Sequence, residues 1–284
     1  MNRFTVGCVP YVNAIPLVEM FEEMGAASPV RLVYKVPSEL PVLLETGAAQ
    51  AILVSSIDAL RTPNRTMAEG VCIGSRGRVK SVRLFSKVPL SEIKTLAWDA
   101  SSMTSNRLAM ILLRELHHVV PEAVVMPPDL KSMLIQADAC VLIGDIGMMA
   151  DGSGLNVMDL GEAWRELTGQ SFVWAAWIGS EALDPELVWW LQRAAACVGS
   201  ERDGEPDYIS RNREAMVAKA MNKANWPEAT ARDYFENVMA YHLDNDLLAG
   251  FREFQGRLLA TGFTEAIHFP RLVPAMETAV AANS

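Results

Sequence analysis

Short runs of consecutive apolar residues, each followed by a polar turn, limit the possible folds of this chain more than any other feature. The clearest runs are Ala51–Val54, Ala139–Ile143 and Phe172–Ile178. A strand that is apolar on both faces is typical of a parallel sheet buried between two layers of helices. Because helical patterns such as Arg107–His117 alternate with the strands, we predict an α/β protein with a largely parallel sheet.

The size and charge of the chain exclude several classes of protein. Its 284 residues are 50% hydrophobic and 21% charged, enough to bury the core of one large domain or two smaller ones. The formal net charge of -9 argues against nucleic acid or an anionic membrane as the main partner. A small anion stays compatible, because amides and a few arginines can create a locally positive pocket.

The sequence also predicts where the protein resides. Strand-like residues follow Met1 almost directly, without the apolar segment of an export signal. No run approaches the ~20 apolar residues that are needed to cross a bilayer. We therefore expect a cytoplasmic protein without a membrane partner.

Cysteine and histidine positions do not indicate a metal centre. The four histidines lack metal-ligand spacing, and the cysteines form no CxxC pair. We predict buried free thiols in a reducing compartment at Cys8, Cys72, Cys140 and Cys197. Glycine-rich nucleotide motifs, GxSxG and HExxH are also absent, so neither a metal nor an organic cofactor is predicted.

The first polar turn follows the strand predicted at Phe4–Val9 and contains Tyr11 and Asn13. In α/β proteins such a turn faces the crevice at the carboxyl ends of the strands, where ligands bind. Asn13 can donate and accept hydrogen bonds from a ligand. Asparagine is also a favoured cap for a helix such as the one predicted at about Ala14–Met24. The local sequence leaves both roles open.

Hydroxyl groups gather at two further strand ends. Ser55 and Ser56 follow the run Ala51–Val54, and either bind a carboxylate or phosphate or cap a short helix. The second turn carries four hydroxyls in five positions, which is more than capping requires. It predicts an anion site at Ser101, Ser102, Thr104 and Ser105.

Charged residues mark two more candidate positions. Gly144 and Asp145 end an apolar run, and the carboxylate either serves a site or caps the next turn. The densest basic cluster, at 76–80, separates two strand patterns at 71–75 and 81–86. It is either a solvated hairpin tip or a source of counter-charge for an anionic ligand.

The chain after Asp184 is predicted to be almost wholly helical. Helices are expected at about 185–199, 206–222, 227–237 and 244–261, with caps at Asp184, Asp244 and Gly262. Earlier in the chain, Ser38 is a good candidate for the N-cap of a helix that ends at Gly47.

A series of short motifs resembles the chorismate dehydratases, within the menaquinone biosynthesis proteins of the futalosine pathway. Each motif is weak alone, but the series is specific and covers nearly the whole chain in order. The motifs are Tyr11-Val12-Asn13-Ala14, Val36-Pro37-Ser38-Glu39-Leu40, Ser56-Ile57, Ile73-Gly74-Ser75-Arg76-Gly77, Ser81-Val82-Arg83-Leu84-Phe85-Ser86, Ser101-Ser102, Thr104-Ser105, Leu142-Ile143-Gly144-Asp145, Asp159-Leu160-Gly161-Glu162, and Tyr234-Phe235 with Phe263.

The resemblance implies a two-lobed fold like that of type II periplasmic binding proteins, with two chain crossings and a helical C-terminal region. Lobe I would contain residues 1–87 and 172–284, and lobe II residues 88–171. The crossings are expected near Ser86–Pro89 and Gln170–Val173, where the strand-helix pattern restarts and closes. A ligand bound between the lobes would favour their closure.

The same resemblance implies the removal of water from chorismate to give 3-[(1-carboxyvinyl)oxy]benzoate. We expect Asn13 and Ser81 to be catalytic by holding the substrate while its own enolpyruvyl carboxylate takes the proton. Neutral donors fixed in a closed site can contribute ~3 kcal/mol each. The expected substrate-binding residues are Tyr11, Ser55, Ser56, Arg76, Ser102, Thr104, Ser105, Gly144 and Asp145. A homodimer is left open.

The chain departs from the family pattern at a few positions. Pro10 stands where the family has serine, Met103 where it has arginine, and Arg78 and Ile146 where it has proline. Arg78 or Arg107 could replace the positive charge missing at Met103. The alternative functions are a 1,4-dihydroxy-6-naphthoate synthase, a non-catalytic binding protein for a small anion, and a cytoplasmic ligand sensor. The synthase is disfavoured because its Ser-Pro-Cys-Pro-Asn-like opening, and its histidine near position 145, are missing here.

Overall fold

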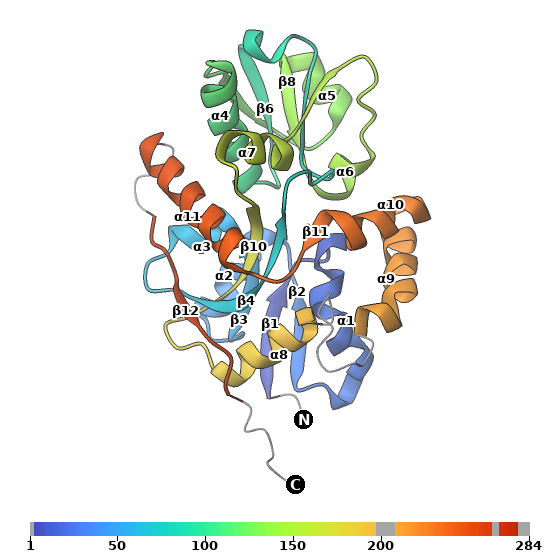
Figure 1. Cartoon of the computed structure of the whole chain (residues 1–284), viewed down its shortest axis with the longest axis vertical. Helices are drawn as coiled ribbons and strands as arrows, with labels where there is room; N and C mark the ends of the chain where they lie inside the picture. Colours follow the sequence, from blue (N-terminus) through green and yellow to red (C-terminus); the bar gives the residue numbers. More distant parts are fainter. Residues whose placement is uncertain (1–2, 197–207, 263–266, 278–284) are drawn as a thin grey trace.

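Two β-sheets organise the chain (Figure 1). The structure is a computed structural model that describes residues 3–196, 208–262 and 267–277. Within these ranges one sheet has seven strands in the order β11-β4-β10-β3-β1-β2, with β12 beside β4. The other has five strands in the order β7-β6-β8-β5-β9. We call the parts of the chain built on the larger and smaller sheets lobe I and lobe II.

The strands of both sheets are short, as the short apolar runs predict. Those of lobe I are β1 (Phe4–Cys8), β2 (Val30–Tyr34), β3 (Ala51–Ser55), β4 (Thr66–Ser75), β10 (Phe172–Gly179), β11 (Met239–Ala240) and β12 (Arg271–Val273). Those of lobe II are β5 (Arg83–Ser86), β6 (Thr95–Asp99), β7 (Glu122–Met126), β8 (Ala139–Leu142) and β9 (Asn156–Asp159).

Helices pack around each sheet (Figure 1). Lobe I has α1 (Ile15–Met24), α2 (Leu40–Glu45), α3 (Ser56–Arg61), α8 (Pro185–Ala196), α9 (Tyr208–Ala224), α10 (Glu228–Asp233) and α11 (Asn245–Ala260). Lobe II has α4 (Thr104–His117), α5 (Leu130–Gln136), α6 (Gly144–Met149) and α7 (Leu160–Thr168). The two-lobed α/β fold and its helical C-terminal region are thus confirmed.

The sheets are mixed rather than largely parallel. Strand β1 runs parallel to β2 and β3, and β6 runs parallel to β7 and β8. Strand β10, however, is antiparallel to both β3 and β4, and β5 is antiparallel to β8 and β9. The parallel prediction is wrong for these two strands and for β11, which is antiparallel to β4. Strands β5 and β10 each follow a crossing between the lobes, so the chain enters its sheet in the opposite direction from the neighbouring strands.

The first crossing lies earlier in the chain than the sequence suggested. Strand β5, which was expected in lobe I, pairs with β8 and β9 in lobe II. The crossing is therefore residues 76–82, between β4 and β5, and the predicted boundary at 87/88 is wrong. Alternating residues identify β5 as a strand but not the sheet that it joins. The second crossing lies between α7 and β10, at the predicted position.

An aromatic cluster ties the second crossing to the C-terminal helices. The rings of Trp164 (α7) and Phe172 (β10) pack edge to face with centroids 5.3 Å apart. Phe254 of α11 lies 5.0 Å from Phe172 and 6.1 Å from Trp164. All three side chains are buried. Such aromatic pairs add ~0.5–1.5 kcal/mol each beyond their buried area, so α11 braces the point where the chain returns to lobe I.

The predicted helix caps are partly confirmed. The Asp244 carboxylate accepts a hydrogen bond from the Leu247 N–H at 3.0 Å, and Asp184 accepts one from the Glu186 N–H at 2.8 Å. The prediction for Ser38 is wrong, because it lies in a 3₁₀ turn before α2 and its side chain forms no cap. The predicted helical residues at 197–199 and 206–207, Cys197 and Phe263 lie outside the described residues.

Three of the cysteines are buried free thiols, as expected. Burial raises the pKa of Cys8 and Cys140 to about 12, so both stay protonated at neutral pH. Among the described residues, no cluster of three or more His, Cys, Asp or Glu side chains could hold a metal ion. None of the helices in those ranges is both long and apolar enough to pass through a bilayer.

Candidate active site

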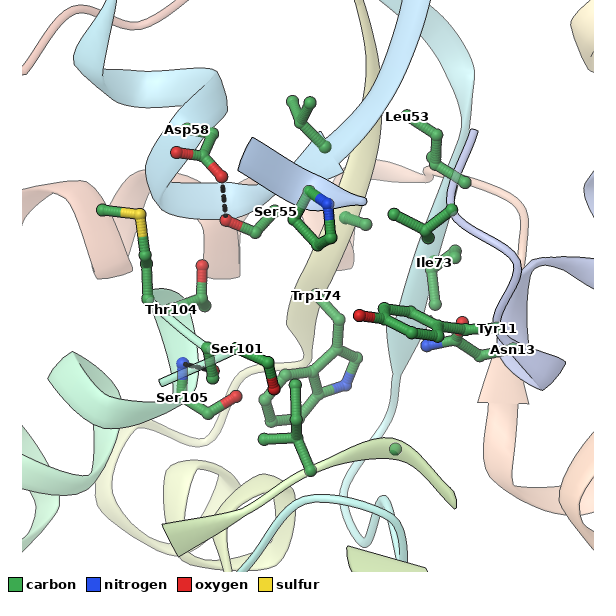
Figure 2. Close-up of a pocket in the computed structure, with 18 of the residues that line it drawn as sticks. Tyr11, Asn13, Leu53, Ser55, Asp58, Ile73, Ser101, Thr104, Ser105 and Trp174 are labelled. Carbon is green, nitrogen blue, oxygen red and sulfur yellow. Dashed lines mark hydrogen bonds between the residues drawn. The ribbon is translucent and has the colours of Figure 1, made fainter. Parts of the chain in front are cut away.

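A cavity of about 590 Å³ lies between the two lobes and has mostly apolar walls. Figure 2 shows Tyr11 and Asn13 on one side, with Ser101, Thr104 and Ser105 facing them. A drug-sized ligand needs ~300–1,000 Å³, so the cavity suits a small ring compound. The structure brings these predicted site residues to its lining: Tyr11, Asn13, Ser55, Ser81, Ser102, Thr104, Ser105 and Gly144.

Asn13 faces the cavity and does not cap a helix. It lies in a 3₁₀ turn (Val12–Ala14) after β1, and the residue in the cap position of α1 is Ala14. The capping alternative is therefore wrong. The Asn13 amide oxygen is buried and has no hydrogen-bond partner among the described residues. An unsatisfied buried acceptor costs ~1–3 kcal/mol, and a donor on a ligand would remove that cost.

Ser81 lies on the first crossing and is paired with a phenol. Its Oγ is 2.9 Å from the hydroxyl of Tyr234, and both side chains are buried at the cavity wall. Burial raises the pKa of Tyr234, so the phenol stays neutral at neutral pH. The pair can therefore donate a proton in a hydrogen bond to a ligand oxygen. The sequence indicates Tyr234 only as part of a motif and not as a residue of the site.

The backbone beside Ser81 is fixed by a carboxylate from lobe II. Asp159 accepts hydrogen bonds from the N–H groups of Val79 (3.0 Å) and Lys80 (2.7 Å) on the crossing. The same carboxylate caps α7 by accepting from the N–H groups of Gly161 and Glu162, at 3.0 and 3.1 Å. Lys80 has a φ of 62°, a conformation that L-residues rarely adopt, which Asp159 stabilises.

Gly161 allows the crossing to approach α7. A Cβ at Gly161 would lie 2.3 Å from the carbonyl oxygen of Gly77. Any larger residue would therefore push the crossing away from α7. Together with Asp159, this glycine gives the Asp159–Glu162 motif a physical role: it holds the segment that carries Ser81.

The hydroxyl-rich turn lies at the N-terminus of the 14-residue helix α4. Ser102 Oγ accepts from the Ser105 N–H at 3.2 Å, and Thr104 Oγ1 accepts from the Ile57 N–H at 3.0 Å. Since a hydroxyl can also donate, each of these two groups can donate to a ligand. The Thr104 bond joins lobe II to lobe I. The positive end of the α4 dipole further favours an anion here.

Helix α3 places a carboxylate and a guanidinium at the cavity. Ser55 Oγ donates to Asp58 Oδ2 at 2.8 Å (Figure 2). Burial raises the pKa of Asp58, although Ser55 and Arg61 oppose the shift. Asp58 and Arg61 are the charged residues among the described lining residues. We missed both, although the i, i+3, i+6 spacing from Ser55 could have placed them on one helix face.

The apolar walls form a slot suited to a ring. Trp174 lies between the two polar sides, with Leu53 and Ile73 on the same side as Tyr11 (Figure 2). The indole N–H of Trp174 donates to Ser75 Oγ at 3.0 Å, which fixes the orientation of the indole. Such walls orient a flat ligand while the surrounding polar groups select its substituents.

The comparison with known proteins assigns the family. A family model described as menaquinone biosynthesis matches residues 4–259. This chain belongs to the menaquinone biosynthesis family. It is also similar to a protein of Thermus thermophilus named chorismate dehydratase, with 27% identity over 272 residues, which are 89% of this chain and 94% of the relative.

Solved structures confirm the fold of this menaquinone biosynthesis protein. A crystal structure of a protein from Archaeoglobus fulgidus has a TM-score of 0.67 at 15% identity, and the match covers 92% of this chain and 98% of that one. The periplasmic aliphatic sulphonate binding protein SsuA from Escherichia coli has a TM-score of 0.64 at 13% identity, covering 95% and 96%. These likenesses establish a binding-protein-like architecture.

Three predicted site residues of this family member do not line the cavity. The Ser56 hydroxyl is buried and donates to the backbone carbonyl of Val173 on the neighbouring strand β10. The Arg76 guanidinium turns outward, 2.6 Å from Asp244 and 3.4 Å from Asp246 in a surface ion-pair network. The prediction that these two side chains face the ligand is wrong. Instead, Ser56 is hydrogen-bonded to the neighbouring strand, and Arg76 is ion-paired with surface carboxylates.

Asp145 lies next to the cavity rather than in its lining. It occupies the first turn of α6, where Ile143 holds the cap position and Asp145 forms no side-chain cap. Its carboxyl group is half-buried, and burial raises its pKa. Gly144 does line the cavity, with a φ of 58° that favours glycine. Of this predicted pair, the glycine backbone reaches the ligand space and the carboxylate does not.

Proposed function

We propose that this protein removes water from chorismate to give 3-[(1-carboxyvinyl)oxy]benzoate, as the first step of futalosine-dependent menaquinone biosynthesis. Family membership and the name of the Thermus thermophilus relative support this substrate. The single observation that carries the proposal is a ring-sized cavity with the amide of Asn13 on one side and a hydroxyl-lined helix N-terminus on the other. A dicarboxylate ring compound matches that arrangement.

The reaction needs little acid–base chemistry from the protein. The ring carbon that carries the enolpyruvyl ether loses a proton, and the electrons of the broken C–H bond delocalise through the ring double bonds to the ring carboxylate. They then return to break the C–O bond of the 4-hydroxyl group, and the ring becomes aromatic. The proton and the hydroxide leave as water, so atoms and electrons balance.

The enolpyruvyl carboxylate of the substrate is the proton acceptor in this proposal. No histidine is among the described residues that line the cavity. Asp58 is engaged by Ser55, and burial raises the pKa of Tyr11, which keeps the phenol neutral. Asn13 and the Ser81–Tyr234 pair then hold the enolpyruvyl group against the reacting C–H bond. Holding reacting groups in contact is itself a large source of rate acceleration.

The test is to incubate the purified protein with chorismate and to follow the benzoate product by chromatography. We expect turnover by the wild type, and about 100-fold losses in Asn13→Ala and Ser81→Ala, the size typical for one preorganised donor. Ser153→Ala, on an exposed loop of lobe II, serves as the control and keeps the wild-type rate. Thermal melting checks that all variants fold.

Chorismate binding without turnover would contradict the enzyme and favour the anion-binding alternative. Turnover of a later intermediate to 1,4-dihydroxy-6-naphthoate, with none of chorismate, would favour the synthase alternative. Wild-type rates in both active-site variants would refute the roles of Asn13 and Ser81. The cytoplasmic location and the homodimer stay predictions.

A further inference from the structure

One cation serves the cavity among the residues that the structure describes. Arg61 and Asp58 are the charged members of that lining, and its other polar side chains are neutral. A dicarboxylate ligand brings two negative charges into a largely apolar space. Burying a carboxylate without a hydrogen-bonding or ionic partner is strongly unfavourable. The position of Arg61 therefore bears directly on how the second charge is held.

The contacts of Arg61 are weak in this structure. Its Nη1 lies 3.4 Å from the thioether sulfur of Met103 and 3.9 Å from Asp58 Oδ1. A thioether is a poor acceptor, and 3.9 Å is too long for a hydrogen bond. The other carboxylate oxygen of Asp58 is engaged by Ser55. The Arg61 side chain is 52% exposed, so the guanidinium can turn toward a better acceptor at small cost.

Arg61 lies on the wall opposite Asn13. It ends helix α3 of lobe I and meets Met103, the residue that precedes α4 of lobe II. Figure 2 shows Thr104 and Asp58 on that wall and Asn13 on the other. Burial lowers the pKa of Arg107, and the nearby positive charge of Arg61 lowers it further. Positive charge is thus concentrated beside the α4 N-terminus.

We propose that Arg61 binds the ring carboxylate of the substrate and stabilises the charge that builds up on it during proton removal. This inference rests on the proposed dehydration. The enolpyruvyl carboxylate must stay beside Asn13 and Ser81 to take the proton, so the ring carboxylate occupies the opposite wall. There it receives the electrons of the broken C–H bond before the C–O bond breaks. A guanidinium matches a carboxylate with two parallel N–H donors.

Arg61, rather than Arg78 or Arg107, supplies the positive charge that is missing at Met103. Arg78 lies 4.0 Å from Asp159, and neither Arg78 nor Arg107 lines the cavity. Arg61 reaches the position of Met103 from the other lobe. The cation is therefore supplied across the seam between the lobes, and closure of the lobes brings it to the anion site.

The experiment compares wild type with Arg61→Gln, Arg61→Lys and a control, Arg31→Gln. Arg31 is an exposed arginine of β2 outside the cavity, where its Nε contacts Thr5, so its substitution makes the same change in net charge. The probes are 3-(carboxymethoxy)benzoate, with both carboxylates, 3-methoxybenzoate, with the ring carboxylate alone, and phenoxyacetate, with the side-chain carboxylate alone. Binding is measured by calorimetry at one salt concentration, and chorismate kinetics are recorded in parallel.

We expect Arg61→Gln to weaken 3-(carboxymethoxy)benzoate and 3-methoxybenzoate about 10- to 100-fold, the range of one charged hydrogen bond. Phenoxyacetate should change by less than about two-fold, within the usual scatter of neutral effects. Arg61→Lys should retain part of the affinity, because it keeps the charge but not the fork. In the kinetics, kcat as well as kcat/KM should fall in Arg61→Gln, since charge on the ring carboxylate grows in the transition state.

Equal weakening of all three probes, no weakening, or the same effect in Arg31→Gln would each overturn the assignment, as would a wild type that binds none of them. Arg61-dependent binding of the two ring carboxylates without turnover of chorismate would leave the carboxylate site standing and refute the dehydratase proposal. If Arg61→Gln raises KM and leaves kcat unchanged, Arg61 only helps to bind the substrate. That result would overturn its role in catalysis.

Discussion

Replacing Asp159 tests whether lobe II positions the segment that carries Ser81. Its carboxylate accepts from two N–H groups of the crossing, at Val79 and Lys80, and from two N–H groups of α7. Asp159→Asn keeps one acceptor oxygen but turns an NH₂ group toward donors that need an acceptor. Asp159→Ala leaves all four N–H groups without this acceptor. Ser81 follows the two bound residues directly, so its hydroxyl should lose its position in both variants.

The expected loss of stability follows from these hydrogen bonds. Losing the cap of α7 costs ~1 kcal/mol, and each buried donor left without an acceptor costs ~1–3 kcal/mol. Because neighbouring losses are not additive, we expect ~3–5 kcal/mol for Asp159→Ala and ~1–2 kcal/mol for Asp159→Asn. The total free energy of unfolding of a protein is ~5–15 kcal/mol, so the asparagine variant stays folded and can be assayed.

The assay combines urea unfolding with chorismate turnover. Asp159→Asn should lower kcat about 10-fold or more, the effect of displacing one catalytic donor, with little change in KM. The control is Asp129→Asn, which alters the N-cap of α5 in the same lobe, where Asp129 accepts from the Ser132 N–H at 2.8 Å. The control should lose some stability and no activity. Equal turnover in the two variants would refute the positioning role of Asp159.

Two further predictions concern the wall opposite Asn13. Thr104→Val removes the hydroxyl that accepts from the Ile57 N–H across the lobes. Turnover should fall about 10-fold or more, and the radius of gyration in solution scattering should rise. Thr104→Ser should restore both values, and an unchanged radius in Thr104→Val would contradict an inter-lobe bond. Because burial raises the folded-state pKa of Asp58 above its ordinary 3.8, the native state binds the proton more tightly and the stability that this adds is lost as pH rises through the folded pKa. Asp58→Asn should therefore melt higher than wild type at neutral pH, with the gap closing as pH falls toward 3.8; a gap that does not depend on pH would show that the carboxyl group is not the cause.

Local sequence determined the elements and the polar turns of this protein. Apolar runs of four to seven residues predict strands, because a strand buried on both faces must be apolar throughout. Polar residues directly after those strands predict ligand contacts, because the carboxyl ends of parallel strands open onto a crevice. Both rules depend only on residues that are neighbours in the chain. They predict a ligand contact at Thr104, which lines the cavity, and leave Asn13 open between a helix cap and a ligand contact.

Tertiary structure decided which side of an element each polar group faces and what it meets there. Ser55 and Ser56 are adjacent and chemically identical, yet one lines the cavity and the other is bound by the carbonyl of Val173, a residue more than a hundred positions away. Arg76 could not be assigned from the sequence, because the acidic residues that hold it lie at the start of α11, far away in the chain.

The same limit applies to Arg61, which no local pattern marks as a cavity residue. Its importance comes from the cavity wall that it shares with Met103, a residue of the other lobe. A hydrogen bond or ion pair depends on distances of a few ångströms, and packing of the two lobes sets these distances between residues far apart in the chain. The sequence alone therefore determined the family, the elements and most of the hydroxyl and amide groups of the site. Only the packed lobes decided where its charges lie.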